Sequence, residues 1–214
     1  MLTSPAVEVA LILVLTAVAA APPAPSAEQA LTVARRVQEH HRNVRDMKGH
    51  FVQTYASGLL GRELVERGTL AIKRPDRMLW EYKEPEKKTF VSDGRKTYFY
   101  VPSDKQVVVR DASESTSDVA LKLLSGRGDL LAEFQVFAVP GAPDRVRLTP
   151  RGEATEVREV VIEADTNGRI VGLELVDLQG NRSRFRFDDV HENLGLSDSL
   201  FEFKVPHGVE VVTG

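Results

Sequence analysis

The chain has 214 residues, of which 42% are hydrophobic and 28% charged, a composition ordinary for one soluble globular domain. Its formal net charge is −3, so the chain has no excess of basic residues of the kind that marks nucleic-acid binding, and no nucleic-acid partner is expected. It contains no cysteine, which excludes disulfides, thiolate metal sites and a cysteine nucleophile.

The N-terminus has the pattern of a signal peptide rather than of a folded element. Residues 9–21 read VALILVLTAVAAA, a run of thirteen apolar or small residues, whereas a membrane-spanning helix needs about 20. Small residues and prolines follow, as in a cleavage zone. We therefore expect residues 1–27 to be a secretory signal, cleaved between Ala20 and Ala27, and residues 28–214 to form a single domain.

The first predicted element of this domain is an amphipathic helix over residues 28–47. Ser26 is suited to cap its start, and Gly49 is suited to end it. The run RRVQEHHRNVR supplies the polar face. Residues three and four positions apart predict the apolar face: Ala30, Val33, Ala34, Val37 and His41.

Beyond the helix, alternation with a period of two predicts about ten antiparallel strands in meander order. Asp93-Gly94 and the run DTNG at 165–168 suit tight hairpin turns, and a final strand pair is expected around Pro206. The first strand begins at His50. The others are expected over residues 62–73, 77–83, 88–92, 96–101, 105–110, 133–139, 144–150, 155–164, 169–178 and 182–190.

A short helix predicted over residues 117–126 interrupts the strands, and a further helical turn is expected at 130–131. A sheet of this size with one apolar face curls, and two short helices cover it only in part. The predicted fold is therefore mainly β (α+β), with an apolar hollow suited to a lipid or another ligand. The residues expected on the inner side of the short helix are Val119, Leu121, Leu123 and Leu124.

Strand alternation also predicts which side chains line the hollow. Met78, Trp80 and Tyr82 share one strand face, directly after the turn formed by residues 74–76. Ordinary core packing explains any single one of them, and a register shift of one residue would move the whole set to the other face. As a set, they favour a lined cavity. The candidate lining residues are Leu70, Ile72, Met78, Trp80, Tyr82, Leu173, Leu175, Phe185 and Phe187.

Motifs of catalysis are missing from the sequence. It has no G-x-S-x-G elbow, no H-E-x-x-H and no phosphate-binding loop. His40 and His41 are adjacent on the predicted helix, so they point apart and cannot chelate a metal together. Glycosidase chemistry would need two carboxylates facing across a cleft, and the acidic pairs here fall mainly at turns. We expect no catalytic residues, no metal and no cofactor, although a secreted hydrolase remains a less favoured alternative.

Four motifs occur in a specific order between residues 30 and 212: FVQTY, GTLAIKRPDRMLWEYKEP, FVSDGRKTYFYVPSDKQV and FEFKVPHGVEVV. Their order and spacing resemble the LolA family of periplasmic outer-membrane lipoprotein carriers. The resemblance implies an unclosed antiparallel half-barrel with a helical lid, in which the hollow receives acyl chains. Arg74 matches the family arginine that hydrogen-bonds the lid and holds the empty carrier closed. Met78 occupies a position that is usually phenylalanine, and several members carry a longer C-terminus than the present sequence, which stops at Gly214.

The same resemblance implies the partners of the protein. They are acylated lipoproteins, an inner-membrane ABC complex that releases them, and an outer-membrane receptor that accepts them. It also implies a monomer located in the periplasm. An alternative is a related lipid-binding, glycolipid-binding or envelope-sensor domain of the same fold, which would be favoured if glycolipid rather than lipoprotein accompanied the purified protein.

Overall fold

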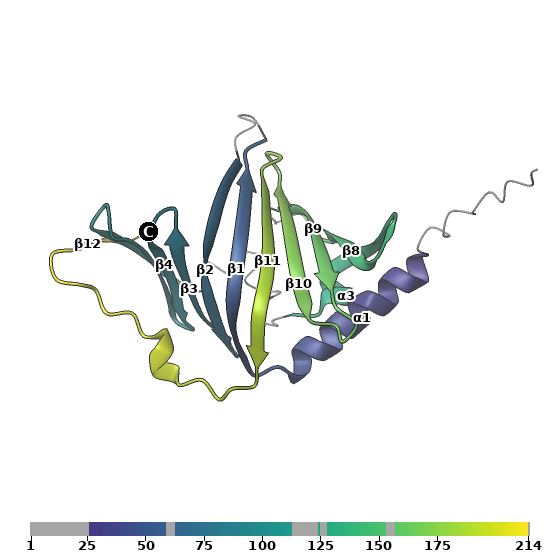
Figure 1. Ribbon diagram of the computed structural model, residues 1–214, viewed down its shortest axis with the longest axis horizontal. Helices are drawn as coiled ribbons and strands as arrows, with labels where there is room; N and C mark the ends of the chain where they lie inside the picture. The colour runs from purple at the N-terminus through teal and green to yellow at the C-terminus, as the bar shows by residue number, and fades with distance from the viewer. Residues whose placement is uncertain (1–25, 59–62, 113–123, 125–127, 153–156, 214) are drawn as a thin grey trace, which may run out of the picture.

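The computed structural model describes residues 26–58, 63–112, 124, 128–152 and 157–213. Within these ranges the chain forms one sheet of twelve strands with helix α1 (Ala27–Asn43) lying against one end of it (Figure 1). No helix in the described ranges is long and apolar enough to cross a membrane. The strands between residues 46 and 111 are β1 (Asp46–Ala56), β2 (Glu63–Lys73), β3 (Arg77–Glu84), β4 (Lys88–Asp93), β5 (Lys96–Val101) and β6 (Gln106–Asp111). The later elements are α3 (Leu130–Glu133), β7 (Phe134–Val139), β8 (Ala142–Pro150), β9 (Val157–Ala164), β10 (Ile170–Asp177), β11 (Arg182–Glu192), η2 (Asp198–Phe201) and β12 (Glu210–Thr213).

The sheet consists of two meanders joined at the middle. Strands β1 to β6 form one meander and β7 to β11 the other, and the pairing of β1 with β11 makes them a single sheet. The edges are β12 and β7, which do not pair with each other, so the sheet stays unclosed. The predicted fold class, a mainly β half-barrel with an N-terminal helix, is confirmed.

Helix α1 begins as predicted but ends four residues earlier. Ser26 accepts a hydrogen bond from the backbone N–H of Gln29, whose side chain returns one to the backbone of Ser26, a reciprocal capping box. The prediction that the helix reaches Met47 is wrong, because β1 already begins at Asp46. Met47 pairs with Ile72 of β2 on one side and with β11 on the other, and this pairing overrides the helical propensity of its neighbours.

The buried carboxylate of Asp46 also fixes the start of β1. It accepts hydrogen bonds from the backbone N–H groups of Leu194, Gly195 and Leu196, at distances of 2.6–3.3 Å. The segment after β11 is therefore anchored at the point where the polypeptide enters the first strand. A carboxylate that accepts several backbone hydrogen bonds is well satisfied despite its burial.

The predicted final strand pair around Pro206 is wrong as well. The segment after β11 (yellow in Figure 1) instead crosses toward the opposite edge of the sheet, where β12 pairs in parallel with β6. On its way, η2 packs against β3 and β4, and Phe201 becomes fully buried. Phe203 stacks on Tyr98 of β5 with ring centroids 5.3 Å apart. Burial of these rings explains why the segment lies on the outer face rather than forming a hairpin.

Two apolar layers result, one on each side of the sheet. The outer layer lies under the C-terminal segment, and the larger inner layer lies on the side of α1. The helix contributes the five residues predicted for its apolar face, which are all buried. The inner core also contains Met47, Phe51, Leu70, Ile72, Met78, Trp80, Leu124, Leu130, Phe134, Val146, Leu148, Val160, Ile162, Ala164, Ile170, Leu173 and Phe187.

Candidate functional site

The inner face carries a cluster of aromatic rings centred on Phe51 of β1. The ring centroids of Trp80 and Tyr82 each lie 4.9 Å from that of Phe51, and both rings meet it edge to face. Phe51 lies opposite Gly68 on β2. A Cβ atom at Gly68 would lie 2.8 Å from the Phe51 ring and 2.0 Å from the backbone oxygen of Glu81. Glycine at this position therefore leaves the room that the Phe51 ring and the backbone of β3 occupy.

Two phenylalanines of β11 extend the cluster. Phe185 and Phe187 are stacked with centroids 6.1 Å apart and planes only 7° from parallel. Both meet the indole of Trp80, at 5.6 Å and 6.3 Å. Aromatic pairs at these separations and tilts are favourable beyond the area that they bury. The rings thus form one continuous apolar surface that spans β3, β1 and β11.

All nine residues predicted to line the hollow contribute to this inner core. Leu70, Ile72, Met78, Trp80 and Leu173 are almost fully buried, and Phe187 is 9% exposed. The remaining three are half-buried and pack against the same cluster: Tyr82, Leu175 and Phe185. The structure also adds Phe51, which alternation places on this face but which the predicted lining omits.

The residues predicted for the lid fall mostly outside the described part of the chain. Val119, Leu121 and Leu123 lie in residues 113–123, of which the structure gives no description. Leu124 is described, and it is helical, 4% exposed and part of the inner core cluster. The helical turn expected at 130–131 is present as α3, capped by Asp129.

Arg74, the predicted latch, follows the last residue of β2 and is half-buried. Its backbone N–H donates to the carbonyl oxygen of Arg45 at 2.9 Å. Burial lowers the pKa of its guanidinium. The neighbouring Lys73 reaches Leu196 and Asp198 of the C-terminal segment on the outer face. Because side chains alternate along a strand, Arg74 belongs to the inner side.

His41 at the end of α1 lies close enough to Arg74 to be influenced by its charge. Burial lowers the pKa of His41 to about 4, helped by the positive charges of His40 and Arg74. Its Nε2 atom has no hydrogen-bond partner among the described residues. The imidazole is therefore neutral at pH 7, buried at the C-terminal end of α1.

A salt-bridge cluster fastens the same end of α1 to the sheet. Glu192 of β11 accepts a hydrogen bond from Nε2 of His40 at 2.9 Å and two from Arg169, at 3.0 Å and 3.3 Å. Burial works to raise the pKa of Glu192, but these hydrogen bonds and charges outweigh it and hold the pKa below its ordinary value. Sequence reasoning missed this cluster, because its members come from three distant segments.

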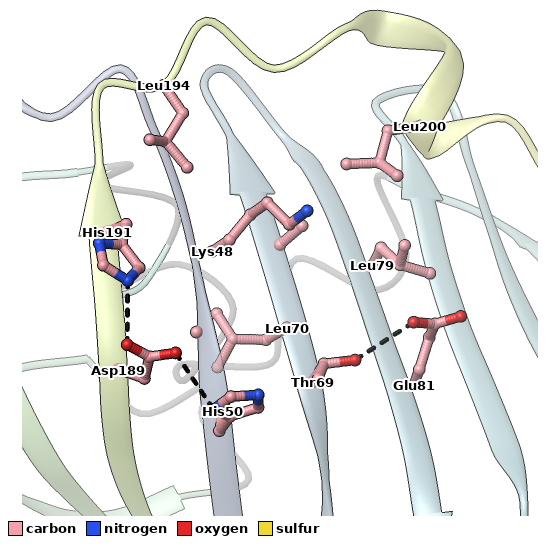
Figure 2. A pocket seen from close by; sticks show the side chains of 12 residues that line it. Lys48, His50, Thr69, Leu70, Leu79, Glu81, Asp189, His191, Leu194 and Leu200 are labelled. Carbon is pink, nitrogen blue, oxygen red and sulfur yellow. Dashed lines mark hydrogen bonds and ion pairs between the residues drawn. The ribbon is translucent and has the colours of Figure 1, made fainter.

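The outer face carries a hollow of about 450 Å³ between the strands and the C-terminal segment (Figure 2). Leu194 and Leu200 form the wall contributed by that segment. Opposite them, Asp189 accepts a hydrogen bond from His191 at 2.9 Å and faces His50 at 3.7 Å. Within the described part of the chain, no three His, Cys, Asp or Glu side chains are placed to hold a metal ion.

Farther along the outer face, arginines and glutamates alternate over β8 to β11. Glu163 pairs with Arg145 and Arg186, each at 2.5 Å, and Glu174 pairs with Arg182 and Arg184. These arginines are largely exposed, and exposed ion pairs contribute little to stability. The outer face is thus polar and solvated here, whereas the inner face of the same strands is apolar.

The model of the family described as outer membrane lipoprotein carrier protein LolA matches residues 42–204. The outer-membrane lipoprotein carrier protein of Alkalilimnicola ehrlichii is 34% identical over 190 residues, covering 87% of this chain and 86% of that protein. That of Chromohalobacter salexigens is 33% identical over 155 residues, covering 71% and 73%. An uncharacterized conserved protein from Thermus thermophilus has a TM-score of 0.52 at 12% identity, covering 86% of this chain and 99% of that one, which shows the fold alone. The chain therefore belongs to the LolA family of outer membrane lipoprotein carrier proteins.

Proposed function

We propose that this protein carries lipoproteins through the periplasm by holding their acyl chains against the inner face of the sheet. The observation that carries the proposal is the continuous aromatic and aliphatic surface around Phe51, Trp80 and Phe185. It lies on the side of α1, whereas the outer face of β8 to β11 is charged. Membership of the LolA family supports lipoproteins as the cargo.

The energetics of a lipoprotein in water require such a surface. Burying acyl chain is worth about 0.8 kcal/mol per methylene group. A triacylated protein with about 45 methylenes would therefore face a cost on the order of 36 kcal/mol on leaving the membrane unshielded. A carrier needs an apolar surface that can open and close, and it needs no catalytic group. We accordingly propose that the protein is a chaperone rather than an enzyme.

We further propose that Arg74 holds the empty carrier closed through a hydrogen bond to the segment around residues 117–124. The half-buried position of Arg74 on the inner side and the burial of Leu124 in the inner core support this assignment. A hydrogen bond to a charged group is worth about 1.5–3 kcal/mol, which biases a two-state equilibrium but can be overcome by incoming acyl chains. The proposed partners are an inner-membrane ABC release complex and an outer-membrane receptor, with the carrier acting as a monomer.

The capping box of α1 narrows the proposed site of signal cleavage. Ser26 caps the helix through its side chain, and cleavage after it would remove the cap. We propose that cleavage falls between Ala20 and Ser26, so that the cap remains in the mature protein. The intact mass of protein purified from periplasm measures this directly, and a mature chain beginning at Ala27 would contradict the proposal.

Binding of acyl chains can be tested with the single tryptophan of the chain, Trp80. Addition of a triacylated lipoprotein should change the emission of Trp80, and the same lipoprotein after deacylation should not. An equal response to both would contradict an acyl-binding inner face. Mass spectrometry of what accompanies the protein from periplasm identifies the cargo, and glycolipid in place of lipoprotein would favour a different carrier role.

A further inference from the structure

The indole N–H of Trp80 is a buried hydrogen-bond donor that has no acceptor in the described part of the chain. Trp80 is 5% exposed, and its Nε1 atom has no hydrogen-bond partner among the described residues. The indole nitrogen can only donate, so no change of tautomer or orientation could make it an acceptor. Buried tryptophans usually find a partner for this atom, because leaving it unpaired forfeits its hydrogen bond with water.

The surroundings of Trp80 are apolar. Three phenyl rings meet the indole, those of Phe51, Phe185 and Phe187, with centroids 4.9–6.3 Å away. Leu70 lies opposite Trp80 on β2. None of these side chains carries an oxygen or nitrogen. The donor thus lies within the surface that we propose to contact the acyl chains.

The neighbouring ring of the cluster, that of Tyr82, differs from Trp80 because its polar atom has a hydrogen-bond partner. The hydroxyl of Tyr82 donates to Oε1 of Gln53 at 2.9 Å, and Lys88 lies over the Tyr82 ring at 4.7 Å. The hydroxyl of Tyr82 is thus paired by a neighbouring side chain. The N–H of Trp80, in contrast, has no such partner among the described residues.

We propose that the indole N–H of Trp80 donates a hydrogen bond to a carbonyl oxygen of the bound acyl lipid, so that the site distinguishes acyl chains from alkyl chains of equal length. This inference rests on the proposed carrier function. A hydrocarbon chain alone offers no acceptor and would leave the donor buried and unpaired. An ester or amide carbonyl at the head of each acyl chain supplies one, in a low-dielectric setting where the hydrogen bond is strengthened.

Three synthetic lipopeptides with the same peptide test the proposal. The first carries a dipalmitoylglyceryl group with two ester carbonyls, and the second is its dihexadecyl ether counterpart without them. The third is the ether lipopeptide with an added N-palmitoyl chain, in which the amide is the only lipid carbonyl. We expect the intact protein to bind the ester about tenfold more tightly than the ether, which corresponds to about 1.4 kcal/mol.

Substitution separates the hydrogen bond from the loss of apolar surface. Trp80→Phe keeps an aromatic ring but removes the N–H, so the preference for ester over ether should disappear. Phe187→Leu removes a ring from the same cluster without touching a polar atom, so it should weaken ester and ether binding equally and keep the preference. If only the N-palmitoyl probe binds more tightly than the ether probe, and Trp80→Phe abolishes this difference in affinity, the amide carbonyl is the acceptor. That result also supports the proposal.

A spectroscopic readout avoids any dependence on the folding of the variant. The chain contains a single tryptophan, so a ¹⁵N-labelled sample gives one indole N–H signal. The ester probe should move its proton downfield relative to the ether probe at saturation. Equal affinity of the carbonyl and ether probes together with an unmoved indole proton would overturn the inference and leave the carrier function standing. Failure of all three probes to bind would instead contradict the carrier function.

Discussion

The indole ring of Trp80 on β3 lies 5.6 Å from the phenyl ring of Phe185 on β11, although β2 and β1 run between these strands. Neighbouring strands are about 4.8 Å apart, so three steps across a flat sheet would separate the two backbones by roughly 14 Å. The rings meet because the sheet curves inward and both side chains lean over β1 and β2. The curvature thereby concentrates apolar surface at the proposed acyl-binding site.

Removing the central ring of this cluster should destabilise the whole sheet. Phe51 is 1% exposed and contacts rings from β3 and β11, so Phe51→Ala should lower the free energy of unfolding by about 3–5 kcal/mol. Urea unfolding measures the change. Tyr55→Ala on the same strand is a suitable control because Tyr55 is 37% exposed. Similar losses for both variants would show that the cluster is not the centre of the core.

The turn between β9 and β10 should tolerate no side chain at Gly168. This residue has φ +88°, and a Cβ atom there would lie 2.4 Å from the carbonyl oxygen of Arg36 in α1. Gly180, in the turn between β10 and β11, has φ +84° but no atom within 4 Å of the added Cβ. Both alanine variants carry the cost of a left-handed backbone, about 1 kcal/mol.

Only Gly168→Ala adds a collision with the helix. Its melting temperature should therefore fall clearly below that of Gly180→Ala. Equal melting temperatures would show that α1 moves away from the turn without cost.

Burial of neutral His41 makes stability depend on pH. Its pKa is about 4 in the folded protein, against an ordinary value of 6.5, so the unfolded chain binds a proton more readily. The stabilisation is complete above pH 6.5 and is lost as the pH falls toward 4. The loss should reach roughly 3 kcal/mol. Urea unfolding at pH 7, 5.5 and 4 measures it.

The variant His41→Leu should remove most of this slope between pH 6.5 and 4. His191→Leu is the matched control, because the side chain of His191 is 65% exposed. It should leave the slope unchanged. A slope that persists in the His41 variant would assign the pH dependence to other groups.

The latch proposed for Arg74 predicts a carrier that binds but does not release. Arg74→Leu should accept lipoprotein and then retain it when the outer-membrane receptor is offered, because the closed empty state has lost its stabilising hydrogen bond. The measurement is the fraction of lipoprotein transferred to the receptor over time. Arg77→Leu, which removes an ion pair with Asp198 at 3.3 Å on the outer face, should transfer normally. Normal transfer by the Arg74 variant would contradict the latch.

The local sequence pattern determined much of the secondary structure of this protein and the face on which many side chains lie. Alternation placed the strands from 62–73 to 182–190 close to their observed bounds, and it predicted the inner side of Met78, Trp80 and Phe185. The capping residue Ser26 and the apolar face of α1 follow equally from spacing, because both depend on residues within a few positions of each other. The order of the family motifs indicated the carrier role.

Tertiary structure alone decided the features that join distant segments. The end of α1 at Asn43 depends on the pairing of β1 with β11, which lies about 140 positions along the chain. The parallel pairing of β12 with β6 and the burial of Phe201 depend on the outer face of the assembled sheet. Several strands form that face together, so the pattern of one strand does not reveal it. The unpaired donor of Trp80 is also invisible in the sequence, since only the finished cluster shows that no acceptor surrounds it among the described residues. Periodicity is a property of neighbours, whereas these features are set by which distant strands and side chains meet.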